Sequence, residues 1–332
     1  MYILGIDSGT GRVSVAVNRN QQLLSKVKYG KNQKYMVSII SLIDKVLKKA
    51  NISLDFVDLF AVNIGPGDFT GTRIGISVAK TLAWVGSKPI CGIGSLDITA
   101  LGIFFKKLKK IQKQLGEGKQ IIIAPVLDVK RNEVYFSFYK MEESSLGNSK
   151  DEYSEFKAHA ISNITIQNKN YFINKVSGSY LTESKDFTKK FSALFVPDNG
   201  LSSYILLGGN GFSSYKHLES EVRELGDELN LKSSGIRSNS SSGSRSGSHL
   251  SSLTGANNDS GINIFLDKGV FSPDAFHLNL CAYYSYLKNR QESLENSLLP
   301  SYGQGNHVTP NYNLDDYGLA PLYVREFTPF KT

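Results

Sequence analysis

Two glycine-rich corners of the chain carry the residue types that can hold a phosphate group. The first follows a β-rich segment and consists of Asp7, Ser8, Gly9, Thr10 and Gly11. Its small residues leave backbone N–H groups accessible to phosphate oxygens, and an aspartate at a strand end can face a bound metal through water. These five residues are the candidate nucleotide-binding set. A tight hairpin that needs glycine for positive φ explains them equally well.

The second corner is longer and lies between a predicted buried strand, residues 57–64, and a predicted helix. Its pattern comprises Gly65, Pro66, Gly67, Phe69, Thr70, Gly71, Arg73, Ile74 and Gly75. We expect the helix to begin near Thr70 or Gly71, with Thr70 as its cap. Helix N-termini attract anions, which makes the corner a second candidate for phosphate. It lacks the Gly-Lys-Ser/Thr ending of a Walker loop.

The remaining reactive residue types form no catalytic constellation. The cysteines, Cys91 and Cys281, are far apart and have no CxxC spacing, so they predict neither disulfides nor a zinc site. His277 has no Gly-x-Ser-x-Gly elbow to partner it. Ser272 and Pro273 are instead typical of a helix start. We therefore expect neither catalytic residues nor a metal site.

The elements that position the first corner follow from hydrophobic periodicity. Residues 2–7, 12–18 and 23–29 predict a three-stranded antiparallel meander. A helix over residues 33–50 follows, with a broad apolar face. A short strand at residues 89–92 precedes a lysine-rich helix. This order of strands and helices predicts a mixed α/β domain with a second domain after it.

In the second half, residues 121–127 and 134–139 predict a strand pair around a turn. The pattern then weakens into a polar stretch and recovers at Ile205, before a helix over residues 218–229. Residues 233–262 contain twelve serines and five glycines. Such a composition cannot bury enough surface to order itself, so we expect a flexible insertion. A helix over residues 273–289 and a strand at residues 321–325 complete the prediction.

The composition excludes a disordered chain and bears on location and partners. Hydrophobic residues make up 40% of the chain, and no window approaches the ~18 consecutive apolar residues of a membrane-spanning helix. No basic leader is visible, so we expect a cytoplasmic protein without membrane contact. The net charge of +8 suggests nucleic acid. However, Lys106, Lys107, Lys109, Lys110 and Lys113 alternate with apolar residues, which favours a solvated helix face over an RNA-binding stripe.

The second corner, with other segments in matching order, resembles the bacterial TsaB (YeaZ) family. These segments are residues 6–8, Gly94 to Asp97, Asp128 to Tyr135, Gly208 to Gly211 and Pro321 to Arg325. The resemblance is strong over about the first 140 residues and absent from the serine-rich insertion. Where the family usually has serine after Gly-Pro-Gly, this chain has Asp68. An aspartate there repels an anion, which counts against nucleotide binding.

The resemblance implies an α/β, actin-like ATPase (ribonuclease H-like) fold with two lobes, over residues 1–115 and 116–332. It also implies a non-catalytic subunit that pairs with a TsaD-like catalytic subunit to modify tRNA with threonylcarbamoyladenosine. TsaD-type catalysis uses a metal held by a His-x-x-x-His pair. No two of the five histidines of this chain have that spacing: His159, His217, His249, His277 and His307.

The implied partners are the TsaD-like subunit, a TsaE-like ATPase in a larger assembly, and tRNA through the complex. No cofactor is expected for the chain alone, and ATP or ADP is expected at most at the interface of the complex. We predict the docking surface from the wide apolar face of the first helix and the start of the second, namely Met36, Ile39, Ile40, Ile43, Leu47, Thr70 and Arg73.

Three alternatives stay open at this stage. The apolar face of the first helix could belong entirely to the core. The chain could be an autonomous ATPase or small-molecule kinase of the same fold, using Asp7 and the turn after it. Direct contact of Lys185, Lys189 and Lys190, or of the lysine-rich helix, with tRNA is a further hypothesis.

Overall fold

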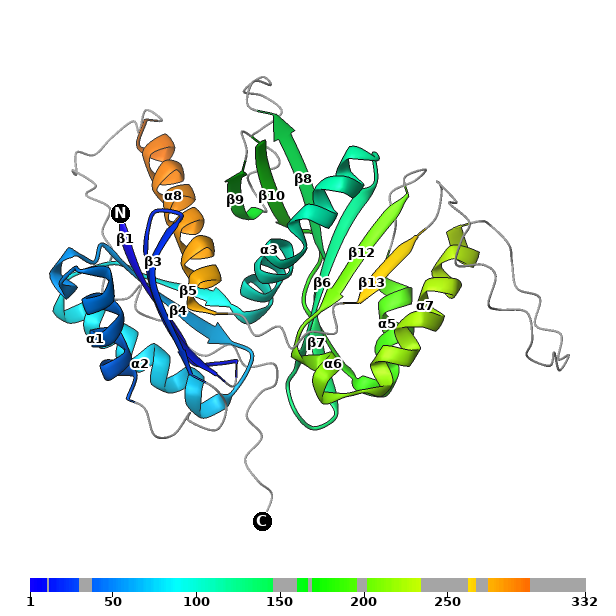
Figure 1. Cartoon of the computed structure of the whole chain (residues 1–332), viewed down its shortest axis with the longest axis horizontal. Coiled ribbons are helices and arrows are strands. Elements are labelled where there is room, and N and C mark those ends of the chain that lie inside the picture. The colour runs from blue at the N-terminus through cyan, green and yellow to red at the C-terminus, as the bar shows by residue number, and fades with distance from the viewer. Residues whose placement is uncertain are drawn as a thin grey trace, which may run out of the picture.

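In the computed structural model the chain forms two α/β lobes, each built on one sheet (Figure 1). Helices α3 (Ser95–Gly116) and α8 (Ala275–Leu298) lie between the sheets, and the other helices cover the outer faces. The predicted two-lobed α/β fold is confirmed. The structure describes residues 1–10, 12–29, 38–145, 160–166, 169–195, 202–233, 262–266 and 274–298.

The first lobe contains a five-stranded sheet in the order β3-β2-β1-β4-β5. Strands β1, β2 and β3 form the predicted antiparallel meander, whereas β1, β4 and β5 run parallel. Alternate residues of β1 face the two sides of the sheet, so Leu4 packs under the outer helices and Ile3 toward α3. The elements are β1 (Tyr2–Asp7), β2 (Val13–Arg19), β3 (Gln22–Tyr29), α1 (Ile39–Ala50), η2 (Leu54–Phe56), β4 (Leu59–Gly65), α2 (Phe69–Val85) and β5 (Ile90–Gly94).

Helix α1 is shorter than predicted. Ser38 has an extended backbone, with φ −67° and ψ 131°, so the helix begins at Ile39 instead of residue 33. Residues 30–37, including Met36, lie outside the described residues. At the other end Asn51 takes the left-handed conformation and its N–H returns to the carbonyl of Lys48. Sequence periodicity predicts the helix correctly but not the point where the chain enters it.

The second lobe is organised around the long buried strand β6. On one side β6 pairs in parallel with β12, which pairs with β13. On the other side it pairs first with β8 and then with β7, so the predicted single strand 134–139 is interrupted after Phe136. The elements are β6 (Gln120–Asp128), β7 (Glu133–Phe136), β8 (Tyr139–Ser145), β9 (Ala160–Ile166), β10 (Lys169–Lys175), β11 (Tyr180–Glu183), η3 (Ser184–Asp186), α5 (Phe187–Leu194), β12 (Ser203–Gly208), α6 (Asn210–Ser214), α7 (His217–Ser233) and β13 (Asn263–Leu266).

Helix α8 returns the chain to the first lobe, although the division at residue 115 assigned it to the second. Its residue Asn279 donates from Nδ2 to the carbonyls of Ile3 and Ala16, both at 3.2 Å. The N–H of Ala275 donates to Ser14 Oγ at 2.9 Å. These contacts join residues about 260 positions apart, which periodicity does not reveal. The insertion beyond its end residues and the predicted strand 321–325 lie outside the described residues.

Candidate functional site

The two glycine-rich corners form one continuous structure at the ends of β1 and β4. The N–H of Asp68 donates to the carbonyl of Gly9 at 2.6 Å. The hydroxyl of Ser8 donates to the carbonyl of Gly71, also at 2.6 Å. The turn of the first corner therefore lies against the start of α2. Gly11 is outside the described residues.

The spacing of the glycines at and just before the start of α2 follows from this contact. A Cβ atom at Gly67 would lie 2.1 Å from the carbonyl oxygen of Gly9, and one at Gly71 would lie 2.1 Å from that of Ser8. A Cβ at Gly75 would lie 2.3 Å from Ser8 Oγ. Residues four apart share one face of a helix, so Gly71 and Gly75, together with Gly67 just before the helix, form a smooth strip on which the first corner rests. The glycine pattern is thus explained by backbone packing.

The cap of α2 is Asp68, and the prediction of Thr70 is wrong. Asp68 Oδ1 accepts a hydrogen bond from the N–H of Gly71 at 2.7 Å, and the helix begins at Phe69. Thr70 is exposed within the first turn. The carboxylate of Asp68 therefore already satisfies a free N–H at the helix start, where an incoming phosphate would meet negative charge.

The carboxylate of Asp7 is turned into the protein. It is fully buried and accepts hydrogen bonds from the N–H of Gly9 (3.2 Å), Thr10 Oγ1 (3.0 Å) and Asn63 Nδ2 (2.8 Å). Burial raises the pKa of Asp7 to about 6, although these three donors oppose the shift. Asn63 Oδ1 in turn accepts from the N–H of Gly65 and from Ser95 Oγ, both at 2.8 Å. The candidate nucleotide residues thus come together as an internal hydrogen-bond network.

The second lobe repeats this arrangement at the end of β6. Asp128 accepts hydrogen bonds from Ser214 Oγ (2.8 Å), Tyr215 Oη (2.9 Å) and both the N–H and Nζ of Lys130 (2.7 Å each). Burial opposes ionisation, but these donors lower the pKa of Asp128 overall. Asn210 Oδ1 accepts a hydrogen bond from the N–H of Asp128 at 2.9 Å. An asparagine thus contacts the strand-end aspartate in each lobe, since Asn63 of β4 contacts Asp7. Local sequence patterns do not reveal Ser214 and Tyr215 as partners of Asp128, because they are 86 and 87 residues away from it.

A glycine also allows the start of α6 to lie close to the backbone of β6. Gly209 has φ 124°, and a Cβ there would lie 2.2 Å from the carbonyl oxygen of Val126. The turn after β6 is unusual because Lys130, Arg131 and Asn132 all have left-handed backbones, with φ of 70°, 57° and 61°. Each lobe therefore has a strand-end aspartate whose carboxylate is satisfied by donors of the chain itself.

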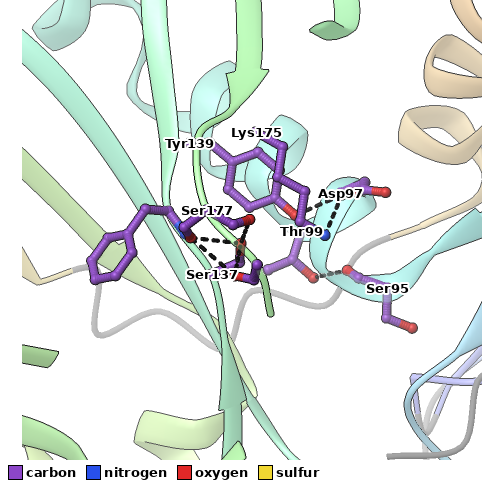
Figure 2. Close-up of polar contacts among 9 residues, drawn as sticks. Ser95, Asp97, Thr99, Ser137, Tyr139, Lys175 and Ser177 are labelled. Carbon is purple, nitrogen blue, oxygen red and sulfur yellow. Dashed lines mark hydrogen bonds and ion pairs between the residues drawn. The ribbon is translucent and has the colours of Figure 1, made fainter. Parts of the chain in front are cut away.

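A polar junction joins the start of α3 to the second lobe (Figure 2). Tyr139 Oη donates to Asp97 Oδ1 at 2.6 Å, and Lys175 Nζ lies 3.8 Å from the same oxygen. Burial raises the pKa of Asp97, while Lys175 and Tyr139 oppose that shift. Burial and the nearby carboxylate also raise the pKa of Tyr139 well above its usual value. Since Ser95 contacts the Asp7 network, α3 connects the corner of the first lobe to the second sheet.

The burial of residues on α1 changes which residues can belong to the predicted docking surface. Ile39, Ile43 and Leu47 are buried in the core of the lobe, because they are the residues of α1 that face the sheet. Of the described α1 residues in that prediction, only Ile40 is exposed, at 53%. The predicted contribution of the other three is therefore corrected to a core role.

Helix α2 instead carries the larger exposed apolar surface. Phe69, Ile74, Trp84 and Val85 are exposed at 47%, 49%, 63% and 71%. The guanidinium of Arg73 lies 3.9 Å from the centre of the Phe69 ring. We call the exposed side of this helix the α2 face, and it comprises Phe69, Thr70, Arg73, Ile74, Ser77, Thr81, Trp84 and Val85.

The metal that the family resemblance implies for TsaD does not fit the described residues. They include no group of three or more histidine, cysteine, aspartate or glutamate side chains that could hold a metal ion. Of the histidines, His217 begins α7, whereas His277 lies on α8 with Nδ1 3.0 Å from Asp274 Oδ1. We derive no chemical step through a metal. No helix in the same part of the chain is long and apolar enough to cross a membrane.

Two lobes with duplicated strand-end aspartates define a protein of the actin-like ATPase fold. A crystal structure of a Pseudomonas aeruginosa protein, described as uncharacterized and similar to peptidase YEAZ, has this fold. It aligns with a TM-score of 0.54 over 98% of this chain and 99% of the other, at 15% identity. At that identity the likeness concerns the fold alone.

Comparison of sequences identifies the family. The family model described as TsaD, tRNA N6-adenosine threonylcarbamoyltransferase, matches residues 25–190, which is half of the chain. The TsaB biosynthesis protein of Buchnera aphidicola is 35% identical over 137 residues, 41% of this chain and 60% of its own length. The Escherichia coli TsaB is 29% identical over 152 residues, 44% of this chain and 58% of its own. The chain belongs to the family that this model describes, within its TsaB (YeaZ) group.

These matches cover only part of each protein. The chain spans about 60% of the length of the curated TsaB relatives it matches. A tRNA N6-adenosine threonylcarbamoyltransferase of Thermodesulfovibrio yellowstonii matches over 37% of its length, at 32% identity. The region matched by the family model, residues 25–190, includes the second glycine-rich corner but begins after β1 and β2 of the first lobe.

Proposed function

We propose that this chain supports threonylcarbamoylation of the adenosine next to the anticodon in tRNAs, as a non-catalytic subunit that pairs with a TsaD-like catalytic subunit. Relatives named for tRNA threonylcarbamoyladenosine biosynthesis support the pathway. The observation that carries the non-catalytic role is the inward-facing site. Asp7 and Asp128 are both satisfied by donors of the chain itself. The same observation disfavours an autonomous ATPase or kinase, which would need these carboxylates for phosphate and metal.

The α2 face is the proposed docking surface for the TsaD-like subunit. It retains Thr70 and Arg73 from the sequence-based prediction and adds the exposed Ile74 and Trp84. Arg73 is the only charged residue on this face, so covering it with a partner requires little desolvation of charge. Fully burying one large apolar side chain contributes about 1.5–3 kcal/mol. Two such side chains therefore supply a substantial part of a stable interface.

The remaining partners are proposed for the assembly and not for the lone chain. A TsaE-like ATPase would join the larger complex, and tRNA would be its substrate in the cytoplasm. ATP or ADP would bind at the interface between subunits. The start of α2 supports this location, because Asp68 already accepts a hydrogen bond from the N–H of Gly71. The carboxylate thereby occupies the place where a phosphate would bind to this chain alone.

Co-elution tests the proposed pairing directly. The chain is co-expressed with the tagged TsaD-like subunit of its organism, and the wild type should co-elute. Changing Ile74 and Trp84 to aspartate should weaken the complex by at least about 3 kcal/mol, or roughly a hundredfold, and abolish co-elution. The matched control is Val176→Asp, because Val176 is 52% exposed on the second lobe. It should co-elute like the wild type.

Circular dichroism and thermal unfolding of each variant show whether it is folded. A double variant that remains folded and still co-elutes fully would contradict docking through the α2 face. A wild-type chain that does not co-elute under these conditions would contradict the pairing itself.

A further inference from the structure

The last three turns of α3 concentrate positive charge on one side of the helix. Residues 98–116 contain five lysines and no acidic residue. We call these five the lysine face, namely Lys106, Lys107, Lys109, Lys110 and Lys113. All except Lys107 are exposed. The helix packs against the second sheet on the face opposite α5 and α7 (Figure 1).

Two of these lysines share one aromatic ring. Lys110 Nζ lies 3.6 Å and Lys107 Nζ 4.7 Å from the centre of the Phe265 ring on β13. Lys110 Nζ is also 5.8 Å from the ring centre of Tyr204. Cation–π attraction holds each ammonium group, but the two positive charges repel one another. A bound anion would relieve this repulsion.

Helix electrostatics explain only part of the pattern. Lysines near a helix C-terminus interact favourably with the dipole, and Lys113 is in the last turn. Some surface lysines elsewhere have acidic partners, as in the pairs of Lys48 with Asp44 (2.8 Å) and Lys185 with Glu183 (2.8 Å). Within the described part of the chain, Lys109 and Lys110 form no ion pair, whereas the charge of Lys113 helps to lower the pKa of nearby Glu117. Uncompensated charge beside an aromatic ring is typical of nucleic-acid-binding surfaces.

We infer that the lysine face binds the phosphate backbone of tRNA. This inference rests on the proposed function, which makes tRNA the substrate of the assembly. Lysines one helical turn apart are separated by ~5.4 Å along the axis, so they can contact successive phosphates of one strand. Because the contacts are to phosphate, they position the tRNA and do not select its sequence. The lysines lie on a solvated helix face, as the sequence favoured, and the inference adds tRNA binding to that face.

The experiment measures fluorescence anisotropy of labelled, unmodified tRNA with the purified full chain between about 50 and about 200 mM salt. Five phosphate contacts predict that affinity falls about 500-fold over this range. Changing Lys109, Lys110 and Lys113 to glutamine leaves two contacts, for which the fall is about tenfold. The charge-matched control changes Lys45, Lys48 and Lys49 of α1 to glutamine, and it should keep the wild-type salt dependence.

A second variant, Phe265→Leu, keeps every lysine but removes the ring that positions two of them. We expect its tRNA affinity to fall severalfold while thermal unfolding changes little. The inference is overturned if the α3 triple variant binds tRNA like the wild type, or if both triple variants lose affinity equally. It is also overturned if the chain binds anionic phosphatidylserine vesicles but not tRNA.

Co-elution of the α3 triple variant with the TsaD-like subunit is measured in parallel. The lysine face and the α2 face are on different helices, so co-elution should persist. Loss of tRNA binding with retained co-elution supports the inference. Retained tRNA binding overturns it. In that case the proposed pairing with the TsaD-like subunit is still tested separately, by co-elution alone.

Discussion

Replacing Gly71 with alanine separates a packing role of the glycine pattern from ordinary helix propensity. In an unconstrained helix this change is favourable by about 1 kcal/mol. Here the new Cβ would lie 2.1 Å from the backbone carbonyl oxygen of Ser8 and 3.0 Å from Asp68 Oδ1. The backbone of the first corner must move, which costs about 1–3 kcal/mol for overpacking. The movement also weakens the Asp68 cap and the Ser8 hydrogen bond, at about 1 kcal/mol each.

The net expected destabilisation is about 3 kcal/mol, which corresponds for a chain of 332 residues to a fall in Tm of about 4 °C in a thermal melt followed by circular dichroism. Gly116→Ala is the matched control, since that glycine is also helical and a Cβ there has no neighbour within 4 Å. It should raise stability by about 0.5–1 kcal/mol. A Gly71→Ala protein as stable as the Gly116→Ala protein would refute the packing account.

Four further substitutions test the burial assignments. In urea unfolding, Ile43→Ala should cost about 2–5 kcal/mol because Ile43 is core, whereas Ile40→Ala should change stability by less than about 0.5 kcal/mol. Tyr139→Phe removes the donor to half-buried Asp97 and should cost about 1–3 kcal/mol, and an unchanged urea midpoint would contradict the junction. The pKa of Asp7 is raised to about 6 in the folded state, so its favourable contribution is complete below pH 3.8 and is lost as pH rises through 6. Between low pH and a pH above 6, the free energy of unfolding of the wild type should therefore fall by about 3 kcal/mol relative to that of Asp7→Asn. The Asp7→Asn variant has no carboxyl group at this position, so its stability should lack this pH dependence.

Local chemistry accounts for the elements that the sequence predicted. The meander, the helix that contains Gly71 and the strand that ends at Gly65 depend on alternation, periodicity and turn residues within a few positions of one another. The cap of α2 was misassigned because Asp68 and Thr70 can both cap a helix. Only the geometry shows that Asp68 Oδ1 faces the N–H of Gly71.

The missed features depend on contacts between distant residues. Ser8 and Gly71 are 63 positions apart, so their separate motifs do not reveal that one corner rests on the other. Strands β9, β10 and β11 are short and have polar ends, as in Lys169–Lys175, where the buried residues occupy only the centre. In α1 the apolar stripe is wide, and which residues face the sheet is set by how the helix docks. Ile40 and Ile43 are therefore indistinguishable until the lobe is assembled.

Reconstitution of tRNA modification tests most directly whether the chain is an accessory subunit. Unmodified tRNA and the threonylcarbamoyl donor are incubated with this chain, with the TsaD-like subunit, or with both, and the threonylcarbamoyladenosine formed is quantified by mass spectrometry. We expect no product from this chain alone, and strong stimulation of the TsaD-like subunit that the Ile74 and Trp84 substitutions abolish. Product formed by the purified chain without its partner would contradict the account.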